Sequence, residues 1–110
     1  MTPTARTLEE LRRQGYTPAV VEHWNPWAKI RQDLYGFIDV LAVKEGESGV
    51  LAIQTTSTDH SANRMTKAQA SPNLRVWLAC GNRFEVWGWA KRGPRGERKT
   101  WQLDRRPTNE

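Results

Sequence analysis

Two short apolar runs, at residues 37–43 and 50–53, constrain the fold of this chain more than any other stretch. Both are rich in Val, Ile and Leu, and residues 44–49 between them hold two glycines, a serine and three charged side chains. This pattern predicts a strand, a turn and a second strand. Because the first run is apolar on both strand faces, we expect that strand to be covered on both sides.

Asp39 is the polar exception in the first run. Residues that lie opposite each other in an antiparallel pair share a face of the sheet, so a turn centred on Gly46 and Glu47 places Gln54 opposite Asp39. Alternation along the second strand puts Thr56 on the same face as Gln54. Burying a lone ionised carboxylate is costly, so we expect a metal ion or a hydrogen-bond partner at Asp39.

The phrases DLYGFIDVLAV, residues 33–43, and VLAIQTTS, residues 50–57, carry a family resemblance. A strand Asp, followed on the next strand by an acidic or amide residue two places before a lysine, resembles the PD-(D/E)XK nuclease superfamily. Restriction enzymes and archaeal-type Holliday-junction resolvases belong to it, and the likeness to small phage and prophage members spans roughly residues 7–103. It implies a Mg²⁺-dependent phosphodiesterase, with Asp39 as the metal-binding Asp and Gln54 in place of the motif's Glu.

The chain departs from that motif at Thr56, which stands where the family carries its lysine. The lysine positions the attacking water and offsets charge on the phosphate, which a threonine hydroxyl does not do. Because superfamily members are known to move this lysine to the following helix, Lys67 is the candidate replacement. Gln54 in place of Glu removes one negative charge from a Mg²⁺ or Mn²⁺ site, which weakens metal binding unless another acid contributes.

Several acidic residues are candidates for the additional carboxylate of the metal site. The first helix of the superfamily often carries a Glu that completes the metal site, which implies Glu10 or Glu9. A capping box with Thr7 is the alternative role for Glu10. Glu22 is a second candidate for the missing carboxylate. Asp33, in the family-like phrase, is expected at the rim of the site, either as a second metal ligand or as a turn former.

Residues 58–70 are expected to form a helix that begins just beyond Thr56. His60, Arg64 and Lys67 then share one helix face, which can lean over the carboxylate cluster. On this hypothesis Lys67 is the catalytic cation and Arg64 binds a phosphate. A stripe of solvated charge is the alternative.

The expected class is α/β: a restriction-endonuclease-like mixed central sheet with two helices in αβββαβ order, a three-stranded antiparallel core and an additional C-terminal strand hairpin. A single nuclease-like domain is expected over residues 1–110, with flexible tails at 1–6 and 104–110. The remaining expected elements are a helix at 7–14, a first strand at 16–24, a buried strand at 74–80, a tight turn at 81–82, a strand at 83–89 and an edge strand at 100–103.

The charge balance favours a polyanionic partner, because the formal net charge is +5 and the pI is about 9.9. Residues 91–99 carry five cations and one acid, together with two glycines and a proline. We expect a flexible basic loop in which Lys91, Arg92 and Arg95 contact the DNA backbone without reading sequence. A solubilising hairpin tip is the alternative.

The leading hypothesis is a metal-dependent DNA endonuclease acting on branched DNA or phage replication intermediates, as a homodimer if it follows the resolvases. The second hypothesis is a catalytically degenerate DNA-binding module of the same fold, and the third is a protein-interaction domain. The sequence contains no charged segment followed by an apolar leader, and no apolar stretch long enough to span a membrane. We therefore expect no membrane association. The expected location is the cytoplasm of a bacterium or of a phage-infected host cell.

Overall fold

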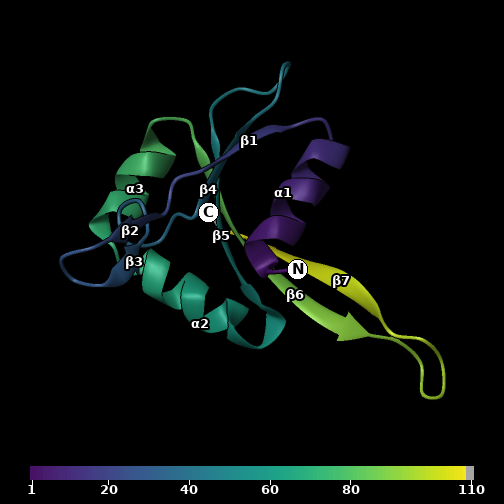
Figure 1. Cartoon of the computed structure of the whole chain (residues 1–110). Coiled ribbons are helices and arrows are strands. Elements are labelled where there is room, and N and C mark those ends of the chain that lie inside the picture. The colour runs from purple at the N-terminus through teal and green to yellow at the C-terminus, as the bar shows by residue number, and fades with distance from the viewer. Residues whose placement is uncertain (109–110) are drawn as a thin grey trace.

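A mixed five-stranded sheet forms the centre of the protein, with strand order β1-β4-β5-β6-β7 (Figure 1). The computed structural model describes residues 1–108. Its helices are α1 (Pro3–Arg13), α2 (Thr58–Gln69) and α3 (Pro72–Ala79). Its strands are β1 (Thr17–Val20), β2 (His23–Asn25), β3 (Ile30–Gln32), β4 (Val40–Val43), β5 (Leu51–Ser57), β6 (Arg83–Arg92) and β7 (Thr100–Pro107).

The helices lie on both faces of this sheet (Figure 1). Strands β5 and β6 are parallel, and the connection between them contains α2 and α3, as a parallel pair requires a long crossover. Met65 of α2 and Leu74 of α3 pack with one cluster of buried side chains, whereas Leu11 of α1 packs with the other. The α/β class and the mixed sheet are therefore confirmed.

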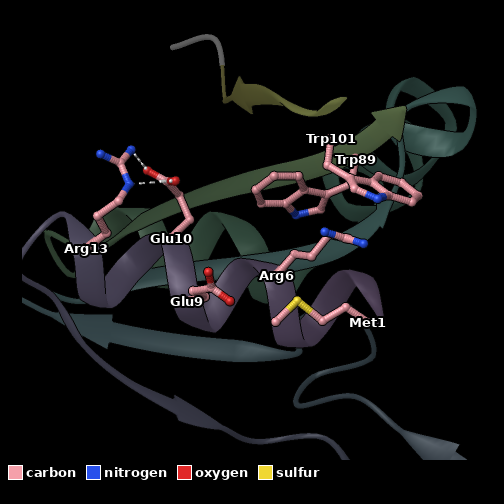
Figure 2. Close-up of a pocket in the computed structure, with 7 residues that line it drawn as sticks. All are labelled: Met1, Arg6, Glu9, Glu10, Arg13, Trp89 and Trp101. Atoms are coloured by element: carbon pink, nitrogen blue, oxygen red, sulfur yellow. Dashed lines mark hydrogen bonds and ion pairs between the residues drawn. The ribbon is translucent and has the colours of Figure 1, made fainter. Parts of the chain in front are cut away.

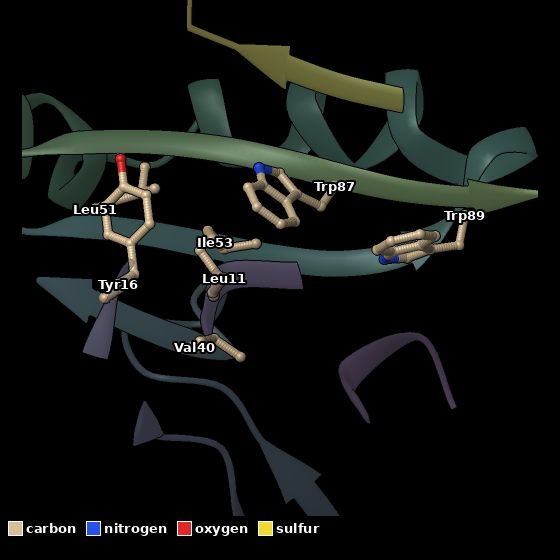
Figure 3. Close-up of a cluster of buried hydrophobic side chains, with 8 residues drawn as sticks. Leu11, Tyr16, Val40, Leu51, Ile53, Trp87 and Trp89 are labelled. Carbon is tan, nitrogen blue, oxygen red and sulfur yellow. The ribbon is translucent and has the colours of Figure 1, made fainter. Parts of the chain in front are cut away.

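Tryptophans fill much of the space under α1 (Figure 3). Trp87 is fully buried against Leu11 and Ile53, and its indole N–H donates to Glu85 Oε1 at 2.8 Å. Trp89 is also buried, and its indole N–H donates to Thr7 Oγ1 at 2.9 Å. Both tryptophans thus bury their rings and still satisfy their polar N–H groups.

The register of β4 and β5 is the one predicted from the turn. Val40 pairs with Ile53 and Leu41 pairs with Ala52, and the regular pairing ends at Val40. The Asp39 amide donates to the Ile53 carbonyl at 2.9 Å. Strand β1 pairs with the other edge of β4, which confirms the three-stranded antiparallel core.

The prediction of a strand at residues 74–80 is wrong, because this segment forms α3. Ser71 caps the helix by accepting from the Asn73 amide at 3.3 Å, and Pro72 occupies its first turn. The apolar run repeats with a helical period: Leu74 is buried, whereas Val76 is 55% exposed. Serine followed by proline was the signal that favoured a helix.

The expected hairpin turn at residues 81–82 is consequently wrong as well. These residues connect α3 to β6, and Asn82 Oδ1 accepts from the Val50 amide at 2.9 Å. The strand expected at 16–24 is split, because β1 ends at Val20 and residues 23–25 pair with β3 as a separate hairpin.

The predicted tails are partly regular structure. Residues 3–6 form the first turn of α1, which is capped by Thr2 and not by Thr7. Residues 104–107 form the end of β7, while residues 109–110 of that predicted tail lie outside the described residues. Among the described residues, no helix has the length and apolar character needed to cross a membrane.

Helix α2 packs so closely on β6 that we expect a side chain at Gly88 to destabilise the fold. A Cβ atom on Gly88 would lie 2.8 Å from the Thr58 Cα, so Gly88→Ala must displace the start of α2 and should lower the free energy of unfolding by about 3 kcal/mol. Gly46→Ala is the matched control, because its Cβ meets nothing within 4 Å and only its positive φ of 92° is strained, at about 1 kcal/mol. Urea unfolding of both variants tests this, and equal losses would contradict the described contact.

Candidate metal centre and adjoining pocket

Asp39 lies at the start of β4 and is only 5% exposed. Its Oδ2 accepts from the Thr55 amide at 2.8 Å, with the Thr55 hydroxyl at 3.5 Å. Gln54 of β5 is also buried, and the Asp39 amide donates to the carbonyl of its neighbour Ile53 at 2.9 Å. The structure therefore bonds Asp39 to the residues on either side of Gln54, but the strand pairing does not include the direct Asp39–Gln54 pair that the sequence predicts.

Two further carboxylates join Asp39. Glu22 lies just after β1 and Asp33 just after β3, and one carboxylate oxygen from each of the three residues lies within 4.8 Å of the others. The Val21 amide donates to the Asp39 carbonyl at 2.9 Å, which aligns the segment before Glu22 with Asp39. The Gly36 amide donates to the Asp33 carbonyl at 3.0 Å, so Asp33 also starts a turn.

This crowding changes the ionisation of Asp39. Burial, together with a hydrogen bond to Asp33, raises the pKa of Asp39 to about 8. The Thr55 amide acts in the opposite direction, and the negative charges of Asp33 and Glu22 raise the pKa further. Without a cation, Asp39 therefore holds a proton at neutral pH, and a bound cation would favour its release.

The donor set fits a hard divalent cation. Mg²⁺ and Mn²⁺ take carboxylate oxygens, and donors that share a small ion lie within about 4–5 Å of one another. Glu22, Asp33 and Asp39 meet that condition. Arg31 forms an ion pair with Glu22 at 3.3 Å, which offsets part of the negative charge of the cluster.

A cavity of about 260 Å³ lies between β5 and α2, and none of the three carboxylates is among the residues that line it. It is lined by Gln54 of β5 and by Arg64 and Lys67 of α2, together with residues of the loop before β4 and of the end of α2: Tyr35, Gly36, Phe37, Ala68 and Ser71. Gln54 lies between Ile53 and Thr55, the two residues that hydrogen-bond to Asp39, so the cavity and Asp39 meet the same stretch of β5. Arg64 and Lys67 of the expected basic face line this cavity, whereas His60 and the three carboxylates do not, so the prediction that this face leans over the carboxylate cluster stays a prediction.

Thr56 is buried on β5 and is not among the residues that line this cavity. The cations at the cavity come from α2 instead, where Arg64 and Lys67 are one helical turn apart and both exposed. Among the described residues that line the cavity, the side-chain cations therefore come from α2 and not from β5.

Glu10 lies elsewhere. It is on α1, which covers the opposite face of the sheet, in a pocket with Arg6, Trp89 and Trp101 (Figure 2). Arg13 forms an ion pair with Glu10, and the Gln14 amide group donates to it at 2.6 Å. The hydrogen bond from Arg13 is the main cause that lowers the pKa of Glu10. The structure does not bring Glu10 to Asp39.

Glu22, the second candidate carboxylate of the sequence analysis, occupies the place considered for Glu10. The signal that favoured it over Glu10 was the hairpin between Glu22 and Asp33, whose pairing brings the two ends together. That hairpin was not predicted, because the sequence was interpreted as one strand through residue 24.

The predicted DNA-contacting cations Lys91, Arg92 and Arg95 lie outside the cavity. Lys91 and Arg92 end β6, and Arg95 is in the connection to β7; all three are exposed. Figure 1 shows this β6–β7 hairpin projecting away from the rest of the sheet. Any contact that it makes with DNA is separate from the carboxylate cluster.

Comparison of the chain with protein-family models, curated protein sequences and solved structures gives no match.

The raised pKa of Asp39 predicts a pH dependence of stability. The folded state holds a proton that the unfolded state releases above about pH 4, so the Asp39 contribution favours folding at low pH and is lost progressively as the pH rises toward 8, by about 1.4 kcal/mol per unit at most. Asp39→Asn mimics the protonated acid and removes this dependence. Without divalent cations, the variant should match wild type near pH 4 and exceed its free energy of unfolding by a few kcal/mol at pH 8. A constant difference across this range would contradict the assignment.

If the three carboxylates bind a cation, we expect that cation to stabilise the folded protein. Mg²⁺ or Mn²⁺ should raise the melting temperature of the wild type, and more so at pH 8 than at pH 6, because at lower pH the cation must displace a proton from Asp39. Glu22→Gln and Asp39→Asn should lose this response. Glu10→Gln is the matched control and should keep it, because Glu10 is not part of the carboxylate group and is bound instead by Arg13 and Gln14. An unchanged response in Glu22→Gln would exclude the three-carboxylate site.

Proposed function

We propose that this protein is a metal-dependent DNA endonuclease with a restriction-endonuclease-like fold. The observation that carries the proposal is the gathering of Glu22, Asp33 and Asp39, in which Asp39 is hydrogen-bonded to the residues on either side of Gln54. Gln54 in turn lines a cavity together with Lys67. Acidic oxygens for a cation and a nearby ammonium group are the parts that phosphodiester hydrolysis uses.

The order of the elements supports the fold assignment. Helix α1, the antiparallel strands β1, β4 and β5, the helix α2 and the parallel strand β6 follow the αβββαβ order of the resembled superfamily. The hairpin β2–β3, the helix α3 and the strand β7 are additions to that order. The resemblance and the site agree on Asp39 and Gln54, which come from neighbouring strands.

Each residue would have a distinct role in the hydrolysis of the phosphodiester bond. Glu22, Asp33 and Asp39 would hold a divalent cation, which when bound activates water and neutralises charge on the phosphate. Asp39 would release its proton as the cation binds, so activity should rise toward pH 8. Lys67 would donate to a phosphate oxygen in the transition state, and Arg64 would bind a neighbouring phosphate through its planar guanidinium group.

A second candidate function is DNA binding without cleavage. The observation that favours it is Thr56 on β5, since the residue that stands in place of the family lysine is buried and does not line the cavity. In that case the net charge of +5 and the exposed cations of the β6–β7 hairpin would bind DNA in a salt-dependent way. The carboxylates would then have no catalytic role.

Cleavage assays separate the two functions. We expect the wild type to cut linear or branched DNA when Mg²⁺ or Mn²⁺ is added, Asp39→Ala to be inactive, and Lys67→Ala to be slower by about 100-fold or more, the cost of losing one transition-state donor. Glu10→Gln should cut as the wild type does. Product formation on labelled DNA at several metal concentrations is the measurement.

Two outcomes decide against this assignment. Cleavage that persists in Asp39→Ala would place the active site elsewhere. DNA binding without cleavage by the wild type in both metals, with affinity that falls as salt rises, would favour the binding module.

A further inference from the structure

The hairpin formed by β2 and β3 exposes large apolar side chains. Trp27 at its tip is 94% exposed, Trp24 is 56% exposed and Ile30 is 51% exposed. A tryptophan that is almost fully solvated contributes little to folding, because it buries almost no area within its own chain. Exposed apolar side chains gathered on one small element are typical of a binding surface.

The tip is nevertheless well ordered by hydrogen bonds. Asn25 Oδ1 accepts from the amides of Trp27 and Ala28 at 3.0 and 3.1 Å, and the Lys29 amide donates to the Asn25 carbonyl at 2.8 Å. Lys29 has a left-handed φ of 56°, which closes the turn. An Asn side chain that binds the following amides fixes such a turn, so Trp27 is held outward on a preorganised support, which lowers the cost of binding.

Both ends of the hairpin are candidate metal ligands. Glu22 immediately precedes β2, Asp33 immediately follows β3, and the ion pair between Arg31 and Glu22 ties the base of the hairpin together. Trp27 is five residues from Glu22 in the chain, so their Cα atoms lie at most about 18 Å apart. That length corresponds to about five stacked nucleotides of one DNA strand.

The chemistry of the hairpin fits nucleic acid. Residues 23–32 contain Lys29 and Arg31 and no acidic residue, so cations accompany the exposed indoles. Aromatic side chains bind unpaired bases by stacking, and neighbouring cations bind the backbone. The bases of an intact duplex are already stacked on one another, so Trp27 needs a base that has left its pair.

We propose that the β2–β3 hairpin is a stacking finger: Trp27 stacks on an unpaired base within about five nucleotides of the carboxylate cluster, and the substrate is DNA with a single-stranded or branched segment. This inference rests on the proposed function, because it assumes that DNA is bound at the carboxylates. It adds the feature of the DNA that is recognised, an unpaired base, and the residue that recognises it.

The test compares a forked DNA, which has unpaired arms, with a blunt duplex of the same length. Binding is measured by fluorescence anisotropy with Ca²⁺ in place of Mg²⁺, and 2-aminopurine in the unpaired arm reports stacking through quenching of its fluorescence. The variants are Trp27→Ala and Trp27→Phe. Trp101→Ala is the matched control, since Trp101 is a 45% exposed tryptophan of β7 that lines the pocket on the α1 face.

We expect the wild type to prefer the fork and to quench 2-aminopurine. Trp27→Ala should bind the fork about tenfold more weakly, with duplex binding unchanged and the quenching lost. Trp27→Phe should keep most of the preference, and Trp101→Ala should keep all of it.

The two proposals fail in different ways. If Trp27→Ala binds and quenches as the wild type does, the stacking finger is wrong, even where Asp39→Ala abolishes cleavage and the nuclease assignment holds. If the wild type never cleaves but Trp27→Ala loses the fork preference, the finger holds and the nuclease assignment fails. If Trp27→Ala alters only the oligomeric state in size-exclusion chromatography, the hairpin is a self-association surface and the finger is overturned.

Discussion

The burial of Asp39 is the constraint on which the rest of the site depends. A carboxylate that is nearly inaccessible to water, with two more carboxylates close by, is unfavourable in its charged form. The fold offers one strong neutral donor, the Thr55 amide, and otherwise adds negative charge. Such an arrangement costs stability at neutral pH, and perturbed groups of this kind concentrate at functional sites.

The sheet places the acidic and the basic side chains near the same stretch of β5. Asp39 is hydrogen-bonded to Ile53 and Thr55, on either side of Gln54, and the crossover helix α2 carries Arg64 and Lys67 to a cavity that Gln54 also lines. The carboxylates and the cations are thus separate groups that meet this part of β5. A phosphodiester, which needs both a cation at its reacting oxygen and donors for its negative charge, matches this division.

The parts of the fold that could be predicted are those with a strong local pattern. The apolar runs and the glycine-rich turn specified the β4–β5 register, and polar periodicity after Thr56 specified α2. Residues 74–80 could not be assigned by apolar character alone, because a short apolar run suits a buried strand and a helix equally. Its serine and proline cap carried the information that apolar content lacked.

The candidate site was partly predictable for the same reason. Asp39, Gln54 and Lys67 follow from strand pairing and helical spacing, whereas Glu22 depends on a hairpin of three-residue strands, too short for a periodic pattern. Glu10 was favoured by the family resemblance, but α1 places it in a separate pocket, where Arg13 and Gln14 bind it. Tertiary placement of a helix on one face or the other is not encoded in its own amphipathic pattern.

Anomalous X-ray diffraction from crystals grown with Mn²⁺ tests the central claim most directly. The account predicts an anomalous peak between the carboxylates of Glu22, Asp33 and Asp39, with coordinating oxygens at about 2.1–2.2 Å and no peak in crystals of Asp39→Asn. Well-ordered carboxylates with no bound ion in crystals that contain millimolar Mn²⁺ at pH 8, where Asp39 is free to ionise, would contradict it.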